Sequence, residues 1–296
     1  MAVRETTVAA PPRRRSVLGR VGQALSRRSV QVVLAVVGLL WLLPTFGLLV
    51  ASFRTVADNN TSGWWTALTN PSQLTVETYK NLLGNDDMLR SFFNTVLITV
   101  PSSVLVVAIA ALAAYAFAWM RFPGRDALFL VVVGLLVVPI QIALIPVARL
   151  YGSLGLFGTI PGVVLFHVAF GLPFAIFLLR NFFSGIPHEL LEAARMDGAS
   201  EMQIFRRVVL PLGVPAIASL LIFQFLWVWN DLLVALVFAG TKASPLTVAI
   251  RNQLGEFSTN IDIVATASFL QLIVPLAVFF AFQRYFVQGL LAGSVK

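Results

Sequence analysis

Six long apolar runs, separated by short polar segments, dominate the hydrophobic pattern of this 296-residue chain. Each run is almost free of charged residues and is near or above the ~20 residues that a helix needs to cross ~30 Å of hydrocarbon. The runs cover residues 32–50, 92–118, 127–147, 160–179, 208–228 and 263–282. The pattern therefore predicts an all-α, polytopic membrane protein with six transmembrane helices.

The segments between the runs carry turn signals. Residues 121–126 read RFPGRD, and the Pro-Gly pair predicts a tight turn between the second and third runs. Residues 52–90 form the longest outer segment, which we expect to begin as a loop and to continue as a short helix capped by Thr75. The turns leave each run free to form a separate helix.

Two of the runs contain candidate breaks. Apolar character continues from residue 208 to residue 239, and a helix of that length, at ~1.5 Å per residue, exceeds the hydrocarbon thickness. We expect it to break at Pro211, at Pro215 or at the polar sequence WND, residues 229–231. The third run holds three residues that favour kinks or close helix packing, namely Gly134, Pro139 and Pro146.

Composition supports the membrane class and excludes several kinds of site. Hydrophobic residues make up 58% of the chain and charged residues 11%, whereas about 25% is usual for a soluble domain. The chain has no cysteine, so it cannot form a disulfide or a thiolate metal site. Two histidines far apart in sequence do not predict a metal site, and no phosphate-binding G-x-x-x-x-G-K-[ST] motif is present. We therefore expect neither an enzyme nor a bound cofactor.

The net charge of +8 is distributed in a way that orients the chain in a bilayer. If the basic tail, residues 1–31, is cytoplasmic, an even number of spans places both termini on that side. The cytoplasmic segments then hold 15 of the 21 Lys and Arg residues, as the positive-inside rule predicts. The first apolar run is too long for a cleavable signal peptide and lacks a cleavage site, so we expect it to remain as span one. The basic excess indicates contact with anionic lipid and no nucleic acid partner.

The longest inner segment, residues 185–211, carries the signals of two short helices joined by a turn. Pro187 suits the first position of a helix, and the Asp197-Gly198 pair ends it. An S-x-x-Q capping box at Ser200 begins the second helix. The expected apolar faces hold Leu190, Leu191, Ala194 and Met196 in the first helix and Met202, Phe205 and Val209 in the second.

These two helices have two interpretations. They could lie on lipid as interfacial amphipathic helices, or the small pair Ala193-Ala194 could let another protein approach closely. The acidic side chains Glu189, Glu192 and Asp197 would be repelled by an anionic leaflet, which favours a protein partner.

The sequence of this segment, EAARMDGASEMQIFRRVVLP, resembles the EAA loop of ABC importer permeases. The matching positions are Glu192, Ala193, Ala194, Gly198, Leu210 and Pro211, while Val208 stands where the pattern prefers Ile. The flanking sequences GLPFAIFLLRNFFSGIP and FLWVWNDLL, with QRYFVQGLLAGSVK at the end, are similar to the maltose-type (MalG-like) carbohydrate permeases over nearly the whole chain. The outer sequence SGWWTAL resembles the alpha-glucoside branch of that family.

The resemblance implies a subunit of a bacterial cell-membrane importer. In that family the two helices dock in a groove on a cytoplasmic ATPase dimer, which binds ATP and Mg²⁺. A second homologous permease completes the translocation path, and an extracytoplasmic sugar-binding protein delivers the solute. Glu192 would contact the ATPase, and Gly198 would set the angle between the helices. The implied coupling residues are Glu192, Ala193, Ala194, Asp197, Gly198, Arg206, Leu210 and Pro211, with Arg207 as a secondary contact.

A sugar path needs neutral hydrogen-bonding groups and aromatic faces within the spans. The candidates are Asn94, with Thr95 beside it, Gln141, His167, Gln224, Trp227, Asn230 and Gln271. For each of them the alternative is an ordinary interhelical hydrogen bond, worth about 0.6 kcal/mol in a membrane.

Two alternative functions stay open at this stage. One is an ABC permease for a different solute. The other is an ion-coupled carrier that acts alone, which would need buried acidic residues within its spans. The sequence offers Asp231 at most for that role.

Overall fold

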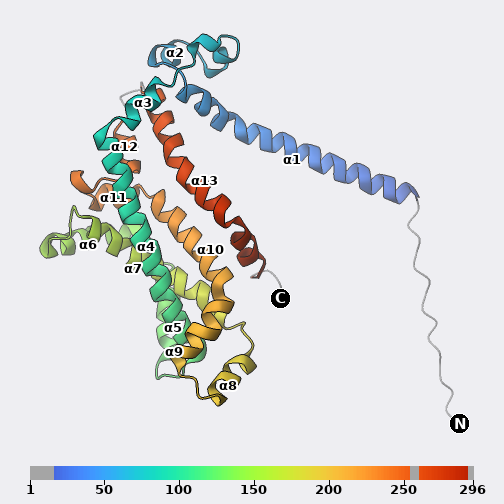
Figure 1. The fold of residues 1–296 in the computed structure, drawn as a ribbon, viewed down its shortest axis with the longest axis vertical. Coiled ribbons are helices and arrows are strands. Elements are labelled where there is room, and N and C mark those ends of the chain that lie inside the picture. The colour runs from blue at the N-terminus through green and yellow to red at the C-terminus, as the bar shows by residue number, and fades with distance from the viewer. Residues whose placement is uncertain (1–16, 254–259, 293–296) are drawn as a thin grey trace.

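The computed structural model describes residues 17–253 and 260–292, with side chains described within 28–253 and 260–283 (Figure 1). These residues form α-helices and short helical turns, together with one isolated backbone bridge between Arg54 and Leu74. The predicted all-α architecture is therefore confirmed.

Five helices in the described part of the chain are long and apolar enough to cross a membrane. They are α1 (Val17–Ser52), α4 (Asp86–Trp119), α7 (Ile160–Phe183), the helix that continues into α10 (Leu210–Trp229), and α13 (Ile261–Ala292). α4 packs along α7 and α10, and α10 packs along α13. α1 meets α13 near its own C-terminal end and points away from the other helices (Figure 1).

The predicted third span is not one continuous helix, and it bends at one of the three positions that were expected to favour a kink. It consists of α5 (Arg125–Leu135) and α6 (Ile140–Leu154), which meet at an angle of 99°. The break lies at Pro139, which has no N–H for the helix ladder and disfavours helical backbone at Val138. Pro146 lies inside α6 without ending it. The count of six spans holds if this bent pair is one span.

The long apolar stretch after residue 208 breaks at one of its predicted positions. α10 ends at Trp229, and Asp231 begins the next helix, α11 (Leu233–Phe238), by accepting the backbone N–H groups of Val234 and Ala235 at 3.3 and 3.0 Å. The two predicted proline breaks are wrong. Pro211 lies inside a continuous helix, directly after a π-helical turn at Phe205–Val209, and the helix runs on through both Pro211 and Pro215.

The outer segment after α1 is more ordered than the expected loop. It contains α2 (Val56–Thr61), the 3₁₀ turns η1 (Trp64–Leu68) and η2 (Pro71–Gln73), and α3 (Glu77–Leu83). The short helix predicted near Thr75 is confirmed as α3, but its N-cap is Val76 and not Thr75, whose hydroxyl accepts the Glu77 N–H at 3.2 Å from one position earlier. Trp64 packs against α1, where a Cβ on Gly47 would lie 2.6 Å from the indole nitrogen.

Arg54 organises this outer segment. Its side chain is 1% exposed and donates six hydrogen bonds to neutral oxygens. The acceptors are the side chains of Asn59, Ser62, Thr66 and Gln73 and the carbonyls of Asp58 and Ser62. Because the five N–H donors of an arginine reach in several directions, one buried side chain joins α2, η1 and η2.

The remaining elements lie at the two ends of the bundle. α8 (His188–Met196) and α9 (Glu201–Ile204) lie at the end opposite α2, α3 and α12 (Leu246–Asn252) (Figure 1). The 3₁₀ turn η4 (Thr241–Ala243) precedes α12. Asn94 of α4 donates to the carbonyls of Lys242 and Ser244, both at 3.0 Å, and so fixes that connection.

Candidate functional site

The charged inner segment forms a helix–turn–helix, as the sequence predicts. α8 ends at Met196, and Gly198 turns the chain with φ of 76°, a left-handed conformation that favours glycine. The predicted capping box is present, with the Ser200 N–H donating to Oε1 of Gln203 at 2.8 Å. Pro187 caps α8 from the position before its first residue, one position earlier than expected.

The prediction that both helices are short is wrong for the second one. α9 passes through a π-helical turn, η3 (Phe205–Val209), directly into α10, and together they form one span from Glu201 to Trp229. Arg206 and Arg207 lie exposed in the π turn and do not end a helix. A displacement of the turn at Gly198 therefore acts on a membrane span through the backbone itself.

The side of the helix–turn–helix that faces the other helices is part of the bundle core. Leu191, Ile204 and Val209 are fully buried in one cluster with residues of α4 and α7. Three residues expected on the apolar faces point outward instead: Leu190, Met196 and Met202 are 45%, 87% and 48% exposed. Sequence periodicity missed Ile204, which lies in the single turn of α9.

A polar network ties α8 and α9 to the end of α4. The Tyr115 hydroxyl donates a short hydrogen bond to Oε2 of Glu201, and Arg195 Nε lies 3.1 Å from the other oxygen, Oε1. This hydrogen bond to Glu201 raises the pKa of the Arg195 guanidinium above its usual value. Trp119 donates to the carbonyl of Phe183 at 3.1 Å, and its ring lies 5.6 Å from that of His188. α4, α7 and α8 are therefore joined at one place.

The predicted coupling residues of α8 and its turn lie mostly on the outer surface. Glu192 is exposed, and its Oε1 lies 3.0 Å from Nδ1 of His188 one turn earlier. Ala193, Asp197 and Gly198 are exposed as well, whereas Ala194 is half-buried against the bundle. Leu210 is half-buried and Pro211 exposed in the first turn of α10, on the far side of the π turn.

A second candidate site lies at the break in the third span. A cleft of about 390 Å³ is bounded by the break and by two polar side chains, Trp227 and Asp231. His167 is 1% exposed, with its ring 5.2 Å from that of Trp227 and its Nε2 3.6 Å from Oδ2 of Asp231. Non-helical backbone at membrane depth is tolerated where it lines a cavity or is buried in protein. The structure thus brings two of the predicted path residues, His167 and Trp227, together beside the break.

The other predicted path residues have different surroundings. Gln141 is exposed at the start of α6, next to Ile140 of the cleft, and Asn230 donates to the carbonyl of Leu226 at 2.8 Å. Gln224 is buried against Gly171 of α7, and Gln271 accepts the Trp229 indole N–H through its backbone carbonyl at 3.2 Å. Asn94 and Thr95 bond the connection before α12, the Thr95 hydroxyl accepting the Leu246 N–H at 2.8 Å. For Asn94 and Thr95 the structure shows the hydrogen-bonding alternative.

Comparison with known proteins identifies the fold and the family. The profile described as "Binding-protein-dependent transport system inner membrane component" matches residues 16–291. The chain belongs to this family of ABC transporter permeases. The permease subunit of a bacterial ABC transporter for the import of alginate has the same fold, with a TM-score of 0.74 and 22% identity over 93% of this chain and all of that one.

Two curated relatives are similar to this permease over most of its length. The osmoprotective compounds uptake permease GgtD of Synechocystis sp. is 48% identical over 272 residues, which cover 90% of this chain and 91% of that one. The alpha-glucoside transport system permease AglG of Rhizobium meliloti is 50% identical over 258 residues, covering 83% of this chain and 68% of that one.

Three residues of this permease escaped prediction. Tyr115 lies in an apolar run, where its contact with Glu201, 86 positions later, leaves no local signal. Arg54 was counted only as an outer positive charge. Asp262 stands one position before the predicted sixth run, and it is buried in the first turn of α13 at 2% exposure. The expectation that the spans offer at most Asp231 as a buried acidic residue is therefore wrong.

Proposed function

We propose that this permease forms half of a sugar-translocating path in an ATP-driven importer and couples to a cytoplasmic ATPase dimer through α8 and the turn at Gly198. The observation that carries the proposal is the helix–turn–helix itself. It has an exposed acidic outer side at Glu192 and is fixed to two membrane helices.

Coupling needs a rigid connection between the docking surface and the spans. One connection is covalent, because α9 continues into α10. The other is polar, because Glu201 joins Arg195 of α8 to Tyr115 of α4. ATP-driven movement of α8 would therefore displace α4 and α10 together, and both pack on α7 beside the cleft at the third span.

The cleft suits a neutral polyhydroxylated solute. Trp227 is 40% exposed and offers an aromatic face, on which the apolar face of a sugar ring can stack. Asp231 supplies a hydrogen-bonding group in the same lining, His167 lies buried behind it with Nε2 3.6 Å from Oδ2 of Asp231, and Gln141 lies nearby on α6. The charge of Asp231 is compensated by the two N–H groups at the start of α11, so the site presents little free charge to a neutral ligand.

The importer needs further subunits. A second permease would cover part of α1, whose apolar residues are almost all exposed in this chain. ATP and Mg²⁺ would bind the ATPase, and an extracytoplasmic binding protein would deliver the solute to the end of the bundle that carries α2, α3 and α12. We place both termini in the cytoplasm from the distribution of Lys and Arg.

The names of the relatives narrow the solute. Besides AglG, a melibiose/raffinose/stachyose import permease of Bacillus subtilis and a trehalose permease of Mycobacterium tuberculosis are 30% and 36% identical to this chain. We therefore propose an oligosaccharide or an alpha-glucoside. The name of GgtD supports a second candidate, an osmoprotective solute.

The test is uptake by the complete transporter in proteoliposomes, with its ATPase, second permease and binding protein. Radiolabelled trehalose and melibiose probe the sugar class, and glycine betaine probes the osmoprotectant class. Glu192→Lys reverses the charge of the docking side, and we expect it to abolish ATP-dependent uptake and co-purification of the ATPase. Asp126→Lys makes the same change at an exposed acid outside α8 and is the control. Normal uptake by Glu192→Lys would refute the coupling role, whereas uptake by the permease alone in an ion gradient would establish a carrier instead.

A further inference from the structure

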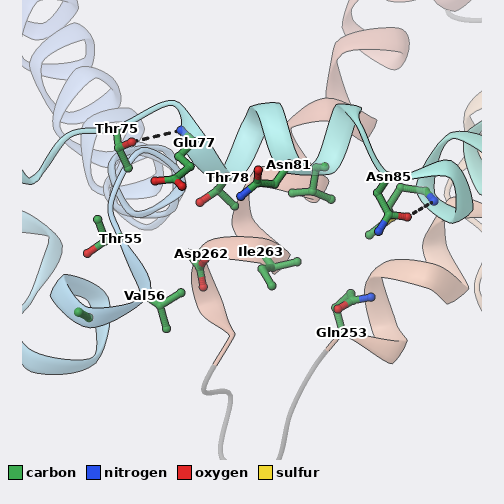
Figure 2. A pocket seen from close by; sticks show the side chains of 13 residues that line it. Thr55, Val56, Thr75, Glu77, Thr78, Asn81, Asn85, Gln253, Asp262 and Ile263 are labelled. Atoms are coloured by element: carbon green, nitrogen blue, oxygen red, sulfur yellow. Dashed lines mark hydrogen bonds between the residues drawn. The ribbon is translucent and has the colours of Figure 1, made fainter.

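The end of the bundle opposite α8 carries an acidic cleft of about 490 Å³ (Figure 2). It lies between α2, α3 and the first turn of α13, and two carboxylates, Glu77 and Asp262, line it. No Lys or Arg is among its described lining residues. Its other polar side chains belong to Thr55, Thr75, Thr78, Asn81, Asn85 and Gln253.

Asp262 is an unusual residue in this cleft because its carboxylate is buried without a full set of partners. The residue is 2% exposed, and its Oδ1 accepts no hydrogen bond within the described part of the chain. Thr78 and Asn81 extend from α3 toward it (Figure 2). A buried carboxylate is costly unless a cation or a hydrogen-bond donor compensates it. The N-terminal end of α13 offsets part of that cost through its dipole, but a cationic group in the cleft would offset more.

The acidic cleft continues into a second one of about 610 Å³, with which it shares Asn85, Met88 and Gln253. The second cleft carries the basic residues Arg90 and Lys242 and the acidic Asp87, whose Oδ1 lies 3.3 Å from Arg90 Nη1. The two clefts together form a groove with an acidic end and an end that contains basic groups. Charged groups distributed along a groove can guide a protein partner that carries complementary charges.

We propose that the acidic cleft is a docking socket for a basic side chain of the extracytoplasmic binding protein, which pairs with Asp262 and Glu77. This inference rests on the proposed function, because it needs that partner to approach the end of the bundle with α2 and α3. The family of this permease is described as binding-protein-dependent, so a protein partner is required in any case. Because the cleft is lined by carboxylates, the residue of the binding protein that contacts it should be basic.

A sugar fits the acidic cleft less well. Its lining contains no Phe, Tyr or Trp on which a ring could stack, unlike the cleft beside Trp227. A neutral solute would also leave two carboxylates without a counter-charge.

The experiment uses the complete transporter in lipid nanodiscs and measures the affinity of its binding protein by surface plasmon resonance at several salt concentrations. Asp262→Asn keeps the shape and removes the buried charge, and we expect it to raise Kd about tenfold or more, mainly through faster dissociation. Glu77→Gln changes an exposed acid, and we expect slower association and a weaker dependence on salt. Asp86→Asn removes an exposed acid outside the cleft on the same face. It should change neither the Kd nor the association rate by more than about twofold.

Basal ATPase activity of each variant shows that the transporter is folded. If Asp262→Asn is unstable, the surface substitution Glu77→Gln still tests the inference. Unchanged Kd and salt dependence in Glu77→Gln and Asp262→Asn would overturn the inference. An equal loss in Asp86→Asn would also overturn it, because the effect would then belong to the general field of the surface. Sugar binding to the transporter alone that Asp262→Asn abolishes, with normal binding-protein affinity, would assign the cleft to solute instead. Failure of the wild-type transporter to bind the binding protein would refute the proposed function itself.

Discussion

Tyr115→Phe should uncouple ATP hydrolysis from uptake. The substitution removes only the hydroxyl that joins α4 to Glu201. A hydrogen bond to a charged group contributes about 1.5–3 kcal/mol, which corresponds to about 10- to 100-fold in the equilibrium between attached and detached α8. The remaining hydrogen bond between α8 and α4 runs from Arg195 to the Trp119 carbonyl at 3.5 Å, a length at which such bonds are weak. The other contacts between α8 and α4 are the Trp119 ring beside His188 and the burial of Leu191 in the shared core, and both are less directional than a hydrogen bond to a charged group.

Two measurements on the reconstituted transporter check this. The first is the number of solute molecules taken up per ATP, which should fall severalfold while ATP hydrolysis persists. The second is the distribution of distances between two spin labels, one on α8 and one just beyond the end of α4. This distribution should broaden. Because the chain has no cysteine, Met196→Cys and Met120→Cys introduce unique labelling sites, and Met196 is 87% exposed.

Tyr151→Phe is the matched control, since it removes the same hydroxyl from a buried tyrosine of α6 that packs on Phe238. It should leave both measurements unchanged, and Glu201→Gln should weaken coupling as Tyr115→Phe does. An unchanged ratio of solute to ATP in Tyr115→Phe, together with an unchanged distance distribution, would refute the idea that this contact transmits the movement.

Three further substitutions test other parts of the structure. Gly198→Ala places a side chain at φ of 76°, which should cost about 1–2 kcal/mol and reduce both uptake and ATPase binding. Gly152→Ala, in open space within α6, is the control. Equal effects of the two substitutions would contradict the argument. Arg54→Met removes six hydrogen bonds from the outer segment and should make residues 55–75 sensitive to added protease, whereas a resistant variant would show that other contacts hold the segment. Trp227→Ala should lower sugar uptake at least tenfold with ATPase docking intact, and normal uptake would move the solute path elsewhere.

Much of the fold could be predicted because hydrophobic length and capping chemistry are local. The apolar runs identified the spans, and the capping box and the Asp197-Gly198 pair identified the turn between α8 and α9. The bend of the third span could not be predicted in the same way. A run of apolar residues indicates that a segment lies within the membrane. The direction of the segment also depends on whether the chain around Pro139 forms a kink or a full break.

The site was predicted less completely, because its decisive contacts join distant parts of the chain. Two predicted path residues, His167 and Trp227, do meet. Tyr115 and Glu201 are separated by 86 positions, so no local window of sequence contains that contact. The acceptors of Arg54 lie closer, within residues 58–73, but their spacing does not show that they converge on one side chain. A single sequence can place polar residues at the ends of spans, but it does not say which of them meet.

The two connections of α8 have different physical consequences. The link to α10 runs through the turn at Gly198 and then through the continuous helix of α9 and α10, which can transmit a push but cannot be released without unwinding. The link to α4 consists of side-chain hydrogen bonds that Tyr115 and Arg195 donate to Glu201, and such bonds can break and re-form on the time scale of a transport cycle. If α8 moves relative to α4 during the cycle, this polar contact is the one that must yield. A π turn lies directly after α9, where a helix is locally wider and more easily deformed. Strain from the ATPase would therefore be shared between the polar contact and the π turn, and the rigid remainder of α10 would carry it toward the cleft at Trp227.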